Sequence, residues 1–168
     1  MTNDDINIAR AAFDASIAEN TEADGPWVAL QDLARSLIGA KLFTVMTVDM
    51  KNEVARREYT SDAKNYPASG TKPIRYDRWF DIVHKQHKSF IANTITEIAT
   101  VFPDHETISS LGCGSVLNIP VVVGGELLGT ANCLDVEHHY SPEKVELSKR
   151  LAIPAKLALL AARCRIHS

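Results

Sequence analysis

Two apolar runs joined by a pair of glycines constrain the fold of this chain more than any other feature. The first run, Ser115 to Val123, is rich in β-branched residues, and the second extends from Glu126 to Val136. Between them, Gly124-Gly125 suits the positive φ angles of a tight turn. Neither run alternates cleanly between apolar and polar residues, so both faces are expected to be covered. The sequence therefore predicts a central β-hairpin that is buried on two sides.

The turn also predicts which side chains share a face of this hairpin. Counting back from a two-residue turn places Asn118 opposite Ala131. Asn118 and Cys133 would then lie on one face, and Asn132 would point to the other. A buried asparagine needs hydrogen-bond partners, which either a neighbouring loop or a small-molecule pocket could supply.

Length and composition restrict the class of protein. The chain has 168 residues, enough for one domain with a substantial core. Its net charge is −3 and its basic residues form no block, which argues against nucleic acid or an anionic membrane as the main partner. No apolar run reaches transmembrane length, and residues 1–20 are unlike a secretion signal, so we expect a cytoplasmic protein. Three cysteines without CxxC spacing fit reduced thiols better than a disulfide framework.

The other segments predict helices and strands in mixed order. A polar break at Thr21 to Gly25 separates a first helix, within residues 1–25, from the rest of the chain, residues 26–168. An antiparallel sheet with the first and last helices on one face is an α+β arrangement. Around the central hairpin the pattern predicts helices at 4–20, 26–38, 76–87 and 103–111, strands at 42–49, 54–61 and 89–93, an irregular loop at 61–75, and a last helix from Ser141 to about Arg163 that is kinked at Pro154.

The run LNIPVVVGGELLGTANCL, followed by a Tyr-Ser-Pro helix start, resembles the end of a GAF domain. The resemblance extends from about Trp27 to the C-terminus. It implies a GAF/PAS-like central antiparallel sheet of about five to six strands, with the N- and C-terminal helices on one face. In that family the terminal helices often pair across a dimer, which makes the helix in residues 1–25 a candidate dimer contact. Loops and short helices on the other face would roof a ligand pocket.

The resemblance also implies where a ligand would bind. Three segments would converge on one side of the sheet: the loop 61–75, the helix around Trp79 and the stretch 102–113. Lys72 and Arg75 lie near Gly70, whose backbone could help to hold an anion, and Trp79 could stack on a planar ligand. The alternative interpretation is that Lys72 and Arg75 are solvated loop charges and that Trp79 is a core residue. The candidate ligand-binding residues are Tyr66, Lys72, Arg75, Trp79, Asp104, Cys113 and Asn118.

An enzymatic alternative uses the same pocket. The GAF family includes the free methionine-(R)-sulfoxide reductase, a cysteine-dependent enzyme of similar length. This chain lacks its Gly-Val-Cys-Gly stretch, and no cysteine follows closely after Phe102-Pro103-Asp104-His105. Cys113 follows the C-terminal end of a predicted helix, whose partial negative charge disfavours a thiolate. Asp104 and His105 form the other candidate pair, for general acid/base catalysis, although neighbours on a helix point in different directions.

Metal binding is not predicted. The acidic and histidine residues between the hairpin and the last helix, and the pair His84 and His87, have no recognised ligand spacing. The former are Asp135, Glu137, His138 and His139. The sequence contains no glycine-rich phosphate-binding motif, and it does not identify a cofactor.

These observations lead to one preferred function and two alternatives. We expect a small-molecule-binding GAF-like sensory or regulatory domain without an output domain of its own, acting as a homodimer through its terminal helices. A small cytosolic enzyme, such as a reductase-like thiol enzyme, is the first alternative. A ligand-free dimerisation module is the second.

Overall fold

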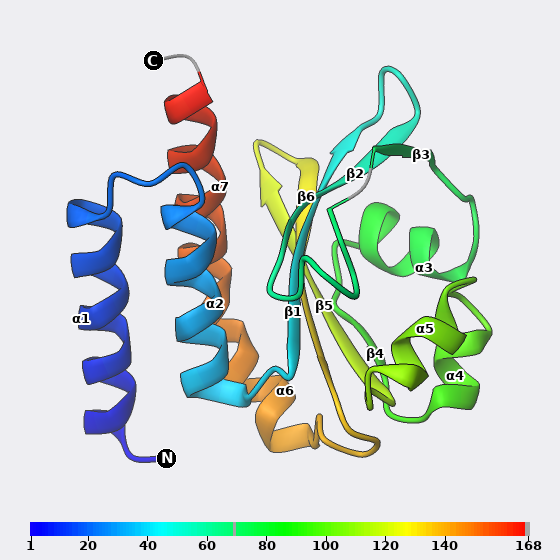
Figure 1. The fold of residues 1–168 in the computed structure, drawn as a ribbon, viewed down its shortest axis with the longest axis horizontal. Helices are drawn as coiled ribbons and strands as arrows, with labels where there is room; N and C mark the ends of the chain where they lie inside the picture. Colours follow the sequence, from blue (N-terminus) through cyan, green and yellow to red (C-terminus); the bar gives the residue numbers. More distant parts are fainter. Residues whose placement is uncertain (69, 167–168) are drawn as a thin grey trace.

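A six-stranded antiparallel sheet divides the computed structural model, which describes residues 1–68 and 70–166, into two sides (Figure 1). The strand order is β3-β2-β1-β6-β5-β4, so the predicted hairpin supplies two of the central strands. The α+β fold with a central antiparallel sheet is confirmed. The strands are β1 (Leu42–Asp49), β2 (Val54–Thr60), β3 (Thr71–Pro73), β4 (Phe90–Ala92), β5 (Ser115–Val123) and β6 (Glu126–Asp135).

The terminal helices all lie on one side of the sheet, with α1 outermost (Figure 1). Their apolar side chains meet the sheet in a core that includes Leu30, Phe43 and Leu159. Ser141 caps α6 as expected, because its hydroxyl accepts a hydrogen bond from the Lys144 N–H. These helices are α1 (Asn3–Glu19), α2 (Gly25–Ile38), α6 (Pro142–Ser148) and α7 (Ala152–Ile166), with a 3-10 turn, Lys149–Leu151, between the last two.

The last helix is therefore broken rather than continuous. The 3-10 turn lies one helical turn before Pro154, which has no N–H to donate to a carbonyl four residues earlier. The helix predicted to kink at Pro154 is therefore interrupted one turn before this proline.

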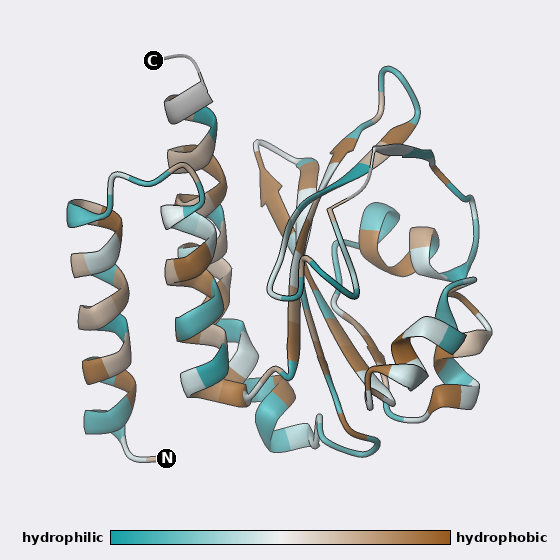
Figure 2. Cartoon of the chain, viewed as in Figure 1, coloured by the Kyte–Doolittle hydropathy of each residue, from teal (hydrophilic) through white to brown (hydrophobic). Residues whose placement is uncertain are grey.

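Short helices and loops cover the opposite side of the sheet (Figures 1 and 2). They form a second apolar cluster with the sheet, which includes Phe90, Ile98 and Leu134. The predicted helix at 76–87 begins as α3, whose cap is Asp77, and continues as a π-helical turn. The segment 61–75 contains the short edge strand β3, which the sequence did not reveal. The short helices are α3 (Arg78–Phe80), the π-helical segment Asp81–Lys85, α4 (Ile95–Ala99) and α5 (His105–Ser110).

The predicted register of the central hairpin is wrong beyond its turn. A β-bulge between Val121 and Val122 inserts one extra residue of β6, so Asn118 pairs with Asn132. Because the side-chain period of a strand is two, one inserted residue exchanges the two faces. Asn118 and Asn132 consequently share a face, and Cys133 points into the helix-side core.

A second bulge separates two neighbouring side chains of β2. Val45 pairs with Tyr59, whereas Met46 pairs with Arg57, so Glu58 is the inserted residue. Simple alternation along the strand would place Tyr59 and Arg57 on the same face. In the structure the Tyr59 hydroxyl donates to Gln31 of α2 at 2.8 Å, while Arg57 lies on the opposite face of the sheet.

Within the described residues, no helix combines the length and apolar character needed to cross a membrane.

Candidate functional site

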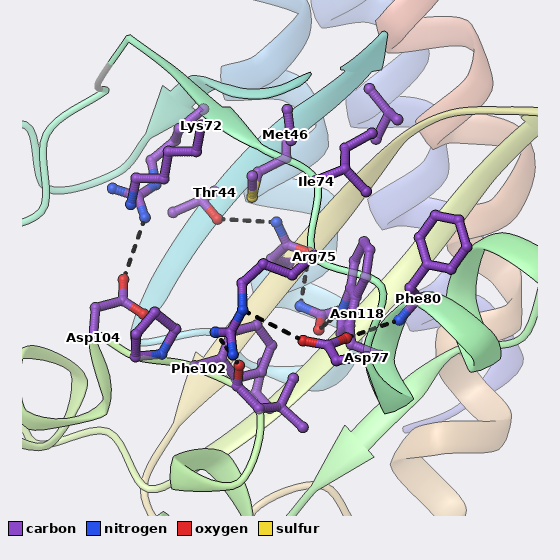
Figure 3. A pocket seen from close by; sticks show the side chains of 18 of the residues that line it. Thr44, Met46, Lys72, Ile74, Arg75, Asp77, Phe80, Phe102, Asp104 and Asn118 are labelled. Carbon is purple, nitrogen blue, oxygen red and sulfur yellow. Dashed lines mark hydrogen bonds and ion pairs between the residues drawn. The ribbon is translucent and has the colours of Figure 1, made fainter. Parts of the chain in front are cut away.

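A cavity of about 450 Å³ lies on the face of the sheet opposite the terminal helices (Figure 3). Its floor comes from the central strands and includes Thr44, Met46, Asn118 and Asn132. Its walls and roof come from β2, β3, the loop after β3, α3, and the connection between α4 and α5. Most lining side chains are apolar, among them Val48, Ile74, Phe80, Phe102, Ile108, Leu127 and Leu134. This combination of a largely apolar lining with a few polar groups is typical of small-molecule sites.

A chain of side-chain hydrogen bonds crosses the cavity floor. Trp79 Nε1 donates to Asn118 Oδ1 at 2.9 Å, and Asn118 Nδ2 donates to Asn132 Oδ1 at 2.7 Å. Asn132 Nδ2 then donates to Thr44 Oγ1 at 3.2 Å. An indole N–H can only donate, so Trp79 fixes the orientation of both amides. The bulge in β6 makes this chain possible, because it brings the two asparagines onto one face.

Asp77 positions the roof above this floor. Its Oδ1 accepts from the Phe80 N–H at 3.1 Å, which caps α3 and holds Trp79 over the sheet. Its Oδ2 lies 3.9 Å from Arg75 Nε. Arg75 Nη1 also donates to the Val101 carbonyl at 3.2 Å, which ties the loop after β3 to the α4–α5 connection.

Arg57, Tyr66 and Asp104 form a polar cluster at one end of the cavity. The Tyr66 hydroxyl donates to Asp104 Oδ2 at 2.6 Å, and the Arg57 guanidinium carbon lies 3.7 Å from the centroid of the Tyr66 ring. Burial, together with the nearby Asp104 carboxylate, raises the pKa of Tyr66 above its ordinary value. Arg57 Nη2 lies 3.6 Å from the same Asp104 oxygen, and Arg57 Nη1 donates to the Pro67 carbonyl at 2.9 Å. Arg57 Nε is buried and has no hydrogen-bond partner among the described residues.

His84 supplies a second buried polar atom without a partner. Its ring stacks on Phe80 with a centroid distance of 4.5 Å, and its Nδ1 forms no hydrogen bond within the described part of the chain. Burial, with lesser effects of His87 and Lys85, lowers the pKa of His84 below its ordinary value. The imidazole is therefore neutral at pH 7 and can offer a hydrogen-bond donor or an acceptor.

The structure brings six of the seven candidate ligand-binding residues onto the cavity wall: Tyr66, Lys72, Arg75, Trp79, Asp104 and Asn118. Cys113 does not line the cavity; it is 2% exposed and belongs to the apolar cluster. Burial raises the pKa of the Cys113 thiol to about 11, which disfavours a nucleophilic thiolate. The cavity position of Arg57 was not apparent from the sequence, because it depends on the bulge in β2.

The other candidate chemistry is dispersed. Asp104 contacts Tyr66, whereas His105 Nδ1 lies 3.1 Å from the Phe102 carbonyl and is not a lining residue. Among the described residues, no group of three His, Cys, Asp or Glu side chains is arranged to hold a metal ion. His139 instead contacts the Ile38 carbonyl at 2.8 Å.

The comparison with protein families agrees with this architecture. The family model described as GAF domain matches residues 19–159, which is most of the chain. The chain therefore belongs to the GAF domain family, whose members are commonly small-molecule-binding sensory domains. No curated protein sequence matches the chain.

Solved GAF structures share the fold at low sequence identity. The GAF domain of an Acinetobacter phosphoenolpyruvate-protein phosphotransferase superposes with a TM-score of 0.70 at 11% identity, covering 99% of this chain and 98% of that one. The GAF domain of a Bacillus halodurans two-component sensor histidine kinase gives 0.68 at 12% identity, covering 85% and 97%. The chromophore-binding domain of a bacteriophytochrome from R. palustris gives 0.65 at 11% identity, covering 95% and 61%.

Proposed function

We propose that this GAF domain binds a small molecule in the cavity on its sheet and acts as a sensory or regulatory module. The observation that carries the proposal is that two cavity-lining side chains, Arg57 and His84, each have a buried polar atom without a partner among the described residues. Leaving such an atom unpaired costs roughly 1–3 kcal/mol. A bound molecule would supply the missing partners, and its binding would tighten the roof that Arg75 and Asp77 connect.

The two alternatives have less support. A thiol enzyme needs an accessible cysteine with a lowered pKa, whereas Cys113 is buried, lies outside the cavity lining and has a raised pKa. A ligand-free scaffold would be expected to fill its cavity with side chains, in contrast to the open volume above Asn118 and Asn132.

The bound state is best tested by mass spectrometry and thermal unfolding. Native mass spectra compared with denatured spectra would reveal a carried-over molecule, and a thermal-shift screen would find ligands for the empty domain. The matched variants are Ala55→Trp, which fills the cavity from β2, and Arg56→Trp, the next residue, whose exposed side chain points the other way. We expect Ala55→Trp to abolish ligand-induced stabilisation and Arg56→Trp to retain it. Equal stabilisation of both variants would refute the proposed site.

We also propose that the domain forms a homodimer through its terminal helices. Three large apolar side chains recur on one face of α7 at helical spacing: Ile153, Leu157 and Leu160, which are 76%, 41% and 43% exposed. A second copy would cover this stripe. Light scattering should report a dimer for the wild type and a monomer of unchanged helical content for Leu157→Glu. A monomeric wild type at micromolar concentration would contradict the proposal.

A further inference from the structure

We propose that the ligand is a planar aromatic monocarboxylic acid. Its carboxylate faces the cationic rim of the cavity, which is formed by Arg57, Lys72 and Arg75, and its ring lies against Trp79 and Phe102. This inference rests on the proposed small-molecule-binding function and specifies the chemical class of the ligand. Four features of the cavity carry it: the charge of the rim, the state of Arg57, the donors on the floor and the position of Gly70 outside the cavity lining.

The cavity lining carries one uncompensated positive charge. Its cations are Arg57, Lys72 and Arg75, and its carboxylates are Asp77 and Asp104. Two of the cations have a carboxylate partner: the Arg75–Asp77 distance is 3.9 Å and the Arg57–Asp104 distance is 3.6 Å. For Lys72, no carboxylate of the described residues lies within ion-pairing distance, so the charge that remains matches a single anionic group.

Arg57 is the cation best placed to hold that group. Its side chain is only 10% exposed, its guanidinium is covered on one side by the Tyr66 ring, and its Nε has no partner among the residues that the structure describes. The carboxylate that pairs with Arg57 is that of Asp104, which accepts a hydrogen bond of 2.6 Å from Tyr66 and lies farther, at 3.6 Å, from Arg57. A ligand carboxylate would therefore give the guanidinium a closer acceptor, and planar carboxylates match its geometry.

The floor complements a second hydrogen-bond acceptor on the ligand. Each amide nitrogen of Asn118 and Asn132 carries two hydrogens, and the chain of hydrogen bonds uses one of each. The remaining N–H groups favour an acceptor over the floor, such as a ring oxygen or nitrogen. Flat apolar surfaces complete the cavity, since Trp79, Phe80 and Phe102 all line it.

The same surroundings suit a carboxylate better than a phosphate. Sites for phosphate groups usually add several backbone N–H donors from a glycine-rich loop or a helix N-terminus. Gly70, which lies close to Lys72 in the sequence, is not a lining residue, and a Cβ placed on it would meet no atom within 4 Å. Recognition here depends on side-chain cations, which pair with carboxylates through charge-assisted hydrogen bonds.

The test compares an acid with its neutral isostere. The probes are 2-naphthoate and 2-naphthamide, which have nearly the same shape and differ in charge, with 3′,5′-cyclic AMP as a phosphate-bearing third probe. Affinities would be measured by calorimetry on protein stripped of small molecules by refolding. The indole N–H resonance of Trp79 reports occupancy of the cavity, because the chain has only two tryptophans and Trp79→Phe assigns the signal. We expect the acid to bind at least tenfold more tightly than the amide and to shift this resonance.

Two variants attribute the preference to the rim. Lys72→Met should weaken naphthoate binding about threefold to fivefold and leave naphthamide binding unchanged, since an exposed ion pair contributes about 1 kcal/mol at most. Lys64→Met removes an exposed lysine that does not line the cavity and should change neither affinity. Lys72 is exposed, so its loss should not affect folding.

The possible results separate this inference from the proposed function. Equal affinity for the acid and the amide, or binding of cyclic AMP alone, would overturn the ligand class while the cavity still served as a binding site. An acid preference that persists in Lys72→Met and is insensitive to salt would overturn the role of the rim charge. If none of the probes binds while the thermal-shift screen finds another class of ligand, the carboxylate inference fails and the sensory function stands.

Discussion

Truncating Asn118 should destabilise the domain by about 2–3 kcal/mol, because this side chain connects the roof of the cavity to its floor. Asn118→Ala removes an acceptor from Trp79 Nε1 and a donor from Asn132 Oδ1. Each bond contributes about 1 kcal/mol net. The Asn132 oxygen adds a further penalty, because it belongs to a residue that is only 5% exposed and loses its partner.

Urea-induced unfolding, followed by circular dichroism, measures this difference. The transition midpoint should fall while its m-value stays constant, which identifies a loss of stability without a change in the exposed surface. Asn7→Ala, an exposed asparagine of α1, is the matched control and should change stability by no more than about 0.5 kcal/mol. A double-mutant cycle with Trp79→Phe should give a coupling energy of about 1 kcal/mol. A loss below about 0.5 kcal/mol for Asn118→Ala, or no coupling, would show that the chain of hydrogen bonds does not form.

Three further perturbations test other parts of the structure. Tyr66→Phe removes a partly buried hydrogen bond and should cost about 1 kcal/mol of unfolding free energy, whereas Tyr76→Phe, which removes an exposed one, should cost less. Equal losses would contradict the difference in burial. Iodoacetamide at pH 8 should add one carbamidomethyl group to the native protein, at the exposed Cys164, because burial raises the pKa of Cys113 to about 11 and that of Cys133 in β6 to about 12. A mass spectrum with three such groups on the native protein would refute this prediction. Finally, burial lowers the pKa of His84 in the native state below 6.5, so the unfolded state binds the proton more readily and stability falls as the pH drops below about 6.5. In thermal unfolding, His84→Gln should reduce this dependence of stability on pH, and an unchanged dependence would show that His84 is not its source.

Local signals in the sequence identified most elements and their ends. Ser141-Pro142 predicted the start of α6, and the glycine pair predicted the turn of the central hairpin. Each of these signals acts within a few residues, through a side-chain cap, a fixed φ angle or a turn that needs glycine. They are therefore visible in a single sequence. The family resemblance then supplied the face on which a cavity would lie.

The features that the sequence analysis missed depend on contacts between distant strands. A bulge changes the face of every later side chain, and nothing in the alternation of β2 or β6 marks where it occurs. Gly129 has a clear structural role only in three dimensions, since a Cβ there would lie 2.2 Å from the Met46 carbonyl oxygen on β1. From the sequence alone, Asn132 was consequently placed on the wrong face, and Arg57 was given no role. Both line the cavity in the structure.

The two bulges together account for the polar character of this cavity. One turns Arg57 to the cavity side while Tyr59 stays on the helix side, and the other aligns Asn132 with Asn118. Without the bulges, alternation would place the Arg57 guanidinium and the Asn132 amide on the helix side of the sheet.

The unpartnered polar atoms show the same division between the two faces. Within the described residues, the buried side-chain atoms without a partner belong to Arg57, His84 and Thr130. The first two line the cavity, and Thr130 shares the cavity face of β6 with Asn132, two residues away. The helix side of the sheet is instead closed by apolar packing. This division between the faces supports the proposal that a bound molecule supplies partners on the cavity side, because buried polar groups normally have partners and local departures from packing rules are expected where a protein functions.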